Sequence, residues 1–204
     1  MLENMSVLSI VVLIVSIVIS LTVHEFMHAF VGHQLGDTTA FEAGRVSFNP
    51  LRHIDPFATV LLPIITVVLF GIPFLAAKPV PFNPSRVKYD DFGSAMIAAA
   101  GPVSNLLLAF VAALISSQFA GGSTIFQILS VFIILNVAIF VFNLIPIPPL
   151  DGSRVLYAFA PDAVRNFFDA IEPYGIFIVF GLVLLGGFDG VVANIEQAIL
   201  NILP

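Results

Sequence analysis

The chain has 204 residues, of which 59% are hydrophobic and 10% charged, and its mean hydropathy is +1.07. Soluble domains are nearer half apolar and a quarter charged, whereas several apolar runs here reach the roughly 18 residues that a bilayer requires. The sequence has no cysteine, which excludes disulfides and thiolate ligands, and its net charge of −6 is spread without a basic block for nucleic acid. We therefore expect an integral membrane protein.

The first predicted helix extends from Val7 to Leu35 and ends at Gly36-Asp37, a typical helix stop. It resembles a signal peptide only superficially. Glu3 is the only charge before His24, so there is no basic leader, and no small-residue cleavage pattern follows the apolar run. We expect this segment to be a retained transmembrane helix.

Two histidines and a glutamate lie inside this apolar run, at His24, Glu25 and His28. A charged side chain at the bilayer centre costs at least about 2.5 kcal/mol on insertion scales, so such residues have a function by default. Positions i and i+4 share one helix face, so both imidazoles can bind one zinc ion while Glu25 acts on a water at the metal. A chance H-E-x-x-H in a buried helix is the alternative, and the apolar setting favours zinc.

The rest of the chain alternates between apolar and polar segments. Pro63, Gly71 and Pro73 interrupt the second apolar run, which makes it a poor continuous helix. Alternating side chains at 41–48 are strand-like, whereas the prolines at 78–82 allow at most an edge strand. The apolar runs after the first cover residues 57–76, 93–117, 124–145 and 171–185, the last of them short and broken by Pro173 and Gly175.

A third ligand must come from elsewhere, and Asp151 is the candidate. A turn aspartate in Pro-Pro-Leu-Asp-Gly is the alternative reading. Asp151 follows the fourth run, and with every run crossing it would lie about 30 Å from His24 and His28, on the opposite side. Ligands must all lie about 2 Å from one zinc, so one run does not cross, and residues 57–76 are the re-entrant candidate.

The basic residues support this topology independently. With a re-entrant second run all seven fall on one side, whereas four full crossings divide them two against five. The positive-inside rule makes that side cytoplasmic, which places the N-terminus outside, the site open toward the cytoplasm and the protein in the cell membrane. The seven are Arg45, Arg52, Lys78, Arg86, Lys88, Arg154 and Arg165.

Three amides lie inside the later runs. Asn105 and Asn143 either form hydrogen bonds between helices or hold the substrate carbonyl and the developing oxyanion. Asn143 precedes Asp151 by few residues, which favours the functional reading for Asn143, whereas the two readings of Asn105 are balanced. We interpret Asn136 as a packing residue.

Together these segments resemble the site-2 protease family of intramembrane zinc metalloproteases, in its compact branch without PDZ or CBS domains, over about residues 20 to 160. The resemblance implies regulated intramembrane proteolysis, with His24, His28 and Asp151 as ligands of one zinc ion, Glu25 as the base, and strands that pair with an unwound substrate. The motifs that carry it are His24-Glu25-x-x-His28, Gly101-Pro102-x-x-Asn105, Asn143-x-x-Pro146-x-Pro148-x-Leu150-Asp151-Gly152, Gly44-Arg45, Asn49-Pro50 and His53-Ile54-Asp55.

The predicted fold is an all-α polytopic membrane protein with about four to five transmembrane helices, a re-entrant segment and short membrane-associated β-strands. We expect one domain over 1–204, with its core at about 7–160 and C-terminal transmembrane or peripheral helices at 161–204. The expected partners are a transmembrane helical protein substrate and the lipid bilayer, with no nucleic acid; an oligomer is possible, but no feature of the sequence supports one. The alternative is an inactive zinc-binding membrane protein or a metal transporter, although no internal repeat is present and Glu25 is retained.

Overall fold

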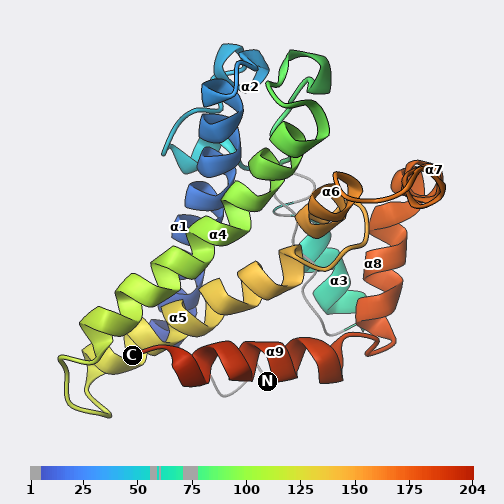
Figure 1. Ribbon diagram of the computed structural model, residues 1–204. Helices are drawn as coiled ribbons and strands as arrows, with labels where there is room; N and C mark the ends of the chain where they lie inside the picture. The colour runs from blue at the N-terminus through green and yellow to red at the C-terminus, as the bar shows by residue number, and fades with distance from the viewer. Residues whose placement is uncertain (1–5, 56–58, 60, 71–77) are drawn as a thin grey trace.

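The computed structural model describes residues 6–55, 59, 61–70 and 78–204, and within these ranges the chain is built from helices without strands (Figure 1). Three helices are long: α1 (Val7–Gln34), α4 (Asp90–Ser116) and α5 (Thr124–Asn143). Serine hydroxyls cap two of them, since Ser6 accepts the Ser9 N–H at the start of α1 and Ser123 accepts the Phe126 N–H at the start of α5.

Four helical stretches of the described chain are long and apolar enough to cross a membrane: Val7–Gln34, Asp90–Ser116, Thr124–Asn143 and Asp162–Leu184. The multi-pass prediction is therefore confirmed. The fourth stretch is interrupted at Pro173, where the chain turns downward from α7 into α8 (Figure 1). The shorter elements are α2 (Thr39–Glu42), η2 (Pro50–Arg52), α3 (Leu62–Phe70), η4 (Pro84–Arg86), α6 (Asp151–Tyr157), α7 (Asp162–Ile171), η5 (Glu172–Tyr174), α8 (Gly175–Leu184) and α9 (Asp189–Ile202).

Helix α4 is the centre of the bundle, because it packs against α1, α5 and α6. Its buried positions are mostly Ala, Gly and Ser, which allow neighbouring helix backbones to approach closely in a membrane. Ala109 and Ala113 of α4 pack against Val137 and Val141 of α5, and side chains of α9 cover this cluster. The large apolar side chains along the first half of α1 are instead exposed, as lipid-facing side chains should be.

The end of α1 is fastened to the start of α4. The backbone N–H of Lys88 donates to the carbonyl of Leu35 at 2.8 Å. Asp37, which is 1% exposed, accepts hydrogen bonds from the N–H and hydroxyl of Thr39 and from the N–H of Asn83. Burial alone would raise the pKa of the Asp37 carboxyl, but these hydrogen bonds lower it below its usual range. Helix α1 therefore ends on the side of the molecule where α4 begins.

The two ends of the stretch between His53 and Lys78 lie side by side. The N–H of Lys78 donates to the carbonyl of His53 at 3.1 Å. Arg45, only 4% exposed, donates to the carbonyl of Arg52 on one flank and to the carbonyls of Lys78 and Pro79, at 3.1 and 2.9 Å, on the other. We call these contacts the Arg45 clamp. Helix α3 inside the stretch has 9 residues, or roughly 14 Å of helix, less than half of a bilayer core of about 30 Å.

The predicted strands at 41–48 and 78–82 are wrong, since neither segment forms a strand in the structure. Residues 41–48 complete α2 and enter turns, and the backbone of 78–82 is irregular. The Pro79 carbonyl binds the Arg45 guanidinium where a strand would need a backbone partner, and Pro79 and Pro81 have no N–H to donate. The described chain therefore offers no β-strand edge to a substrate at these positions.

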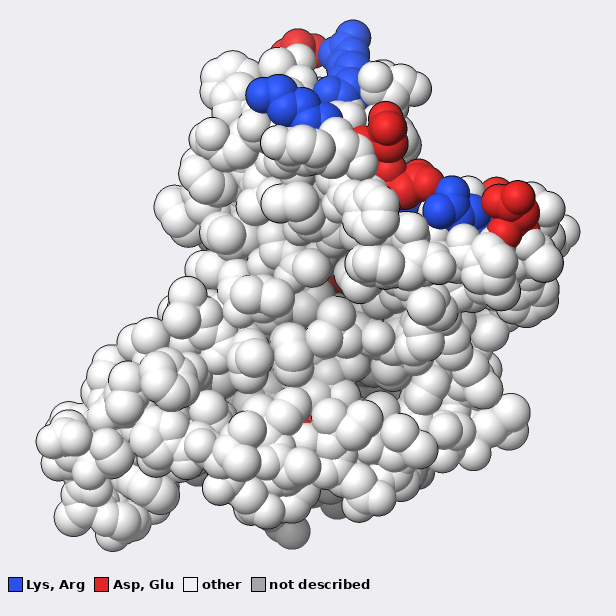
Figure 2. Space-filling view, in the orientation of Figure 1, with Lys and Arg blue, Asp and Glu red and all other residues white. Residues whose placement is uncertain are grey.

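All seven basic residues lie at one end of the molecule, as the topology argument predicts. The Arg165 guanidinium binds the Asp91 carboxylate at 2.6 Å, which brings α7 to the start of α4, and Arg154 of α6 lies 6.0 Å from the centre of the Phe82 ring. In the view of Figure 2 the charged side chains gather at the end formed by α2, the start of α4 and the α6–α7 region, above an almost uncharged surface. The other five basic residues belong to the chain between α1 and α4: Arg45, Arg52, Lys78, Arg86 and Lys88.

Candidate metal centre

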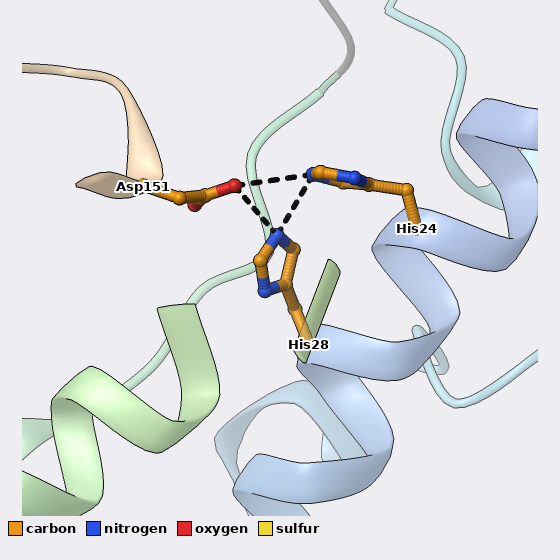
Figure 3. Close-up of side chains that lie close together, drawn as sticks. All are labelled: His24, His28 and Asp151. Carbon is orange, nitrogen blue, oxygen red and sulfur yellow. Dashed lines mark hydrogen bonds and ion pairs between the residues drawn. The ribbon is translucent and has the colours of Figure 1, made fainter. Parts of the chain in front are cut away.

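The structure brings His24, His28 and Asp151 together, although more than a hundred residues separate the aspartate from the histidines (Figure 3). The two imidazole Nε2 atoms are 3.0 Å apart, and the Asp151 Oδ2 atom lies 3.2 Å from that of His24 and 3.3 Å from that of His28. Both histidines are less than 10% exposed. These three side chains are the group in the described chain that could hold a metal ion.

The outer nitrogen of each imidazole is already hydrogen-bonded. His24 Nδ1 lies 2.7 Å from the side-chain oxygen of Asn105, and His28 Nδ1 lies 2.7 Å from the carbonyl of Ile97. Carbonyl oxygens only accept, so both Nδ1 atoms donate, and in the neutral imidazole each Nε2 then presents a lone pair to the centre. Metal-bound histidines commonly use their second ring nitrogen in this way.

The inner atoms fit a cation. Asp151 Oδ2 is buried and has no hydrogen-bond donor in the described chain, and it faces two imidazole lone pairs. Such a convergence of acceptors is favourable around a positive ion. A tetrahedral zinc site with bonds of about 2.0–2.1 Å has ligand atoms about 3.3 Å apart, close to the observed separations of 3.0–3.3 Å.

Two glycines allow the ligands to meet. A Cβ atom on Gly101 of α4 would lie 2.4 Å from His28 Nε2 and 2.7 Å from His24 Nε2. A Cβ atom on Gly152 would lie 2.2 Å from the carbonyl oxygen of Leu144, just beyond α5. Gly101 therefore opens the space in front of the imidazoles, and Gly152 lets the start of α6 approach the end of α5, which brings Asp151 to the centre.

Glu25 lies next to His24 on α1 and is 7% exposed. Burial lowers the pKa of the Arg45 guanidinium, and the negative charge of Glu25 opposes that effect. The carboxylate therefore interacts electrostatically with the Arg45 clamp on the charged side of the molecule. A buried carboxylate beside two imidazoles that could bind a metal is the arrangement that an H-E-x-x-H helix provides for proton transfer.

Of the two readings of Asn105, the structure shows the hydrogen bonds between helices. Asn105 is fully buried, and its amide nitrogen donates to Asn136 Oδ1 at 2.8 Å and to the Ser20 carbonyl at 3.3 Å. Both of its N–H groups are used, and its oxygen faces His24, so no donor is left for a substrate. Asn143 donates to the Ile139 carbonyl of its own helix at 2.9 Å, and its amide has a second hydrogen to offer.

Sequence reasoning missed the contact between Asn105 and Asn136, because it interpreted Asn136 as a packing residue. It also assigned no role to the small size of Gly101. A signal for both was present, since a Gly-Pro pair and two amides inside apolar helices indicate close backbone approach and interhelical hydrogen bonds. The other histidines lie outside the centre: His33 stacks on Phe41, and His53 Nε2 donates to the Ser47 carbonyl.

Fold and site together define a polytopic membrane protein whose helices bury a candidate metal centre of two histidines and one aspartate. Residues 117–186 match the description "Peptidase family M50". The chain belongs to this family, the site-2 proteases, because a relative shares 37% identity over most of its length. The resemblance inferred from the motifs is thus confirmed.

That relative is the Bacillus subtilis protein named "Putative zinc metalloprotease YwhC", and the 187 aligned residues cover 86% of this chain and 82% of the relative. A Methanocaldococcus jannaschii protein with the same description is 29% identical over 153 residues, covering 75% of this chain and 73% of its own. A Mycobacterium tuberculosis relative, Rip2, also so described, is 30% identical over 196 residues, covering 89% and 71%. No solved structure matches the chain.

Proposed function

We propose that this protein is an intramembrane zinc endopeptidase that hydrolyses peptide bonds in the transmembrane segments of membrane protein substrates. One observation carries the proposal. The inner atoms of His24, His28 and Asp151 converge within 3.3 Å of one another beside the buried Glu25, inside an apolar helix bundle of the M50 family.

His24, His28 and Asp151 are the proposed ligands of one zinc ion. A zinc ion held by these residues would act as a Lewis acid, which would polarise the substrate carbonyl and make a water acidic enough to attack near neutral pH. Glu25 takes the proton of the attacking water and later delivers it to the leaving amine. Asn143, at the end of α5, offers its second N–H to the oxyanion.

We further propose that the site opens toward the cytoplasm and that the protein resides in the cell membrane. The seven basic residues at one end support this orientation through the positive-inside rule. With that end in the cytoplasm, α1 runs from outside to inside, and the stretch around α3 re-enters from the cytoplasmic side. The whole chain of 204 residues then forms one protease domain with its core in about residues 7–160.

Cleavage of single-span peptides by the purified protein in detergent or vesicles tests the proposal. We expect the wild-type protein to cut a subset of the peptides, a chelator to abolish cleavage, and added zinc to restore it. We expect Glu25→Gln to retain zinc and lose cleavage, since an amide cannot take a proton from water. A Glu25→Gln variant that still cuts shows that Glu25 is not the base.

Two other outcomes separate the alternative functions. Zinc binding without cleavage of any peptide by the wild-type protein indicates a binding protein. Zinc movement across a vesicle membrane indicates a transporter. The peptides are compared with scrambled versions of equal hydropathy, so that the test distinguishes a substrate sequence from general hydrophobicity.

A further inference from the structure

A chain of buried amides connects three helices to the candidate metal centre. It begins at Asn136 in the middle of α5, continues through Asn105 of α4, and ends at the outer nitrogen of His24 in α1. Asn105 and Asn136 are both 0% exposed. The distances are 2.8 Å from Asn105 Nδ2 to Asn136 Oδ1 and 2.7 Å from Asn105 Oδ1 to His24 Nδ1.

The direction of each hydrogen bond is fixed by backbone carbonyls, which can only accept. The Asn136 amide nitrogen donates to the Phe132 carbonyl at 2.9 Å, so its oxygen points toward Asn105. Asn105 donates its two N–H groups to that oxygen and to the Ser20 carbonyl, so its own oxygen must face His24. The reversed amide would place N–H against N–H and leave two acceptors unsatisfied.

We propose that Asn136 and Asn105 are positioning residues for the metal centre: the Asn136–Asn105 relay holds the proton of His24 on Nδ1 and thereby presents Nε2 to the ion. The inference rests on the proposed zinc site but adds a role for two residues that touch neither the ion nor a substrate. Asn105 acts on His24 directly, and Asn136 acts by deciding which way the Asn105 amide is turned.

Simple helix packing accounts less well for this arrangement. Asn136 already donates within its own helix, and a residue needed only for packing at a fully buried position of an apolar bundle would normally be apolar. His28 reaches the same orientation through a backbone carbonyl, which cannot turn. His24 has a side-chain amide in that position, and an amide can turn unless a further partner holds it. Asn136 is the closer of its two such partners, at 2.8 Å, and the Ser20 carbonyl at 3.3 Å is the other.

The experiment compares zinc dissociation constants of purified protein, measured by competition with a chelating dye, and absorption spectra after cobalt replaces zinc. Asn136→Leu has a similar shape and no polar atom, and Asn136→Asp retains an oxygen that can accept from Asn105. We expect about 10-fold weaker zinc binding for Asn136→Leu, within the range of about 10–100-fold known for residues that orient metal ligands, and a changed cobalt spectrum. We expect the Asn136→Asp protein to retain most of the wild-type zinc affinity and the wild-type cobalt spectrum.

Ser130→Ala serves as the matched control. Ser130 lies on the same helix and also donates to the carbonyl four residues before it, at 2.8 Å, as Asn136 does. Its loss should leave zinc binding unchanged. Thermal unfolding of the metal-free variants separates a lost fold from a lost orientation, and a folded Asn136→Leu protein with wild-type affinity and spectrum overturns the relay. A wild-type protein that binds no zinc overturns the proposed function as well, so the two failures are distinct.

Discussion

Gly101→Ala is the most direct test of the metal centre, because it adds a single carbon atom at its wall. The new Cβ would lie 2.4 Å from His28 Nε2, 2.6 Å from His28 Cε1 and 2.7 Å from His24 Nε2. Ordinary van der Waals contact begins at 3.4 Å, so the imidazoles or helix α4 must move by about 1 Å. The methyl group therefore presses on the two nitrogen atoms that would bind zinc.

A displacement of this size is larger than the variation in bond length that a zinc site tolerates. Zinc–ligand distances hold within about 0.2 Å, and α4 cannot retreat easily because it also packs against α5 and α6. We expect the zinc dissociation constant to rise at least about 100-fold, which corresponds to roughly 2.7 kcal/mol. The assay is competition with a chelating dye, supported by elemental analysis of bound zinc.

Gly32→Ala is the matched control, since Gly32 lies at the same interface between α1 and α4. Its Cβ would lie 3.6 Å from Ile97 Cδ1, an ordinary contact, and Ala is the better helix former by about 1 kcal/mol. We expect Gly32→Ala to bind zinc as the wild-type protein does. If Gly101→Ala also retains full zinc affinity, the ion is not held where the two Nε2 atoms converge, and the assignment of the site is wrong.

Two further perturbations have definite expected results. Asp151→Ala removes one of the three converging ligand atoms, and we expect zinc affinity to fall by about 100-fold or more; full occupancy by elemental analysis would exclude Asp151 from the site. Asp37→Asn removes a charged acceptor with three donors, so we expect about 1–3 kcal/mol lower unfolding free energy at pH 7. Because the folded-state pKa of Asp37 lies below the unfolded value of about 3.9, its stabilisation is present above that pH and lost as the pH falls through the lowered value. The difference in unfolding free energy between the wild-type protein and the variant should therefore be smaller at pH 3 than at pH 7. An equal difference at both pH values refutes the charge argument.

The grouping of the three candidate metal ligands could be predicted from the sequence, because it depends only on residue spacing within one helix and on which apolar runs cross the membrane. The spacing of His24 and His28 fixes one helix face, and the need to bring Asp151 to the same side requires that one apolar run does not cross. The grouping of the basic residues gave the same topology independently. None of this required knowledge of how any helix is rotated about its axis.

Helix rotation explains what could not be predicted. Whether Asn105 faces a substrate or His24 depends on how α4 is turned against α1, and the partner of Asn136 depends on α5 as well. The strand predictions failed for a different reason. At 41–48 the alternation of side chains was a weak signal. At 78–82 the buried Arg45 guanidinium binds the backbone carbonyls of Lys78 and Pro79, which a sheet would have paired with another strand.

The Arg45 clamp also has a consequence for motion. One planar guanidinium holds the backbone on both flanks of the segment that contains α3. Any displacement of Arg45 therefore loosens both flanks at the same time. Glu25 interacts electrostatically with the same guanidinium, so such a displacement also changes the electric field at the proposed base.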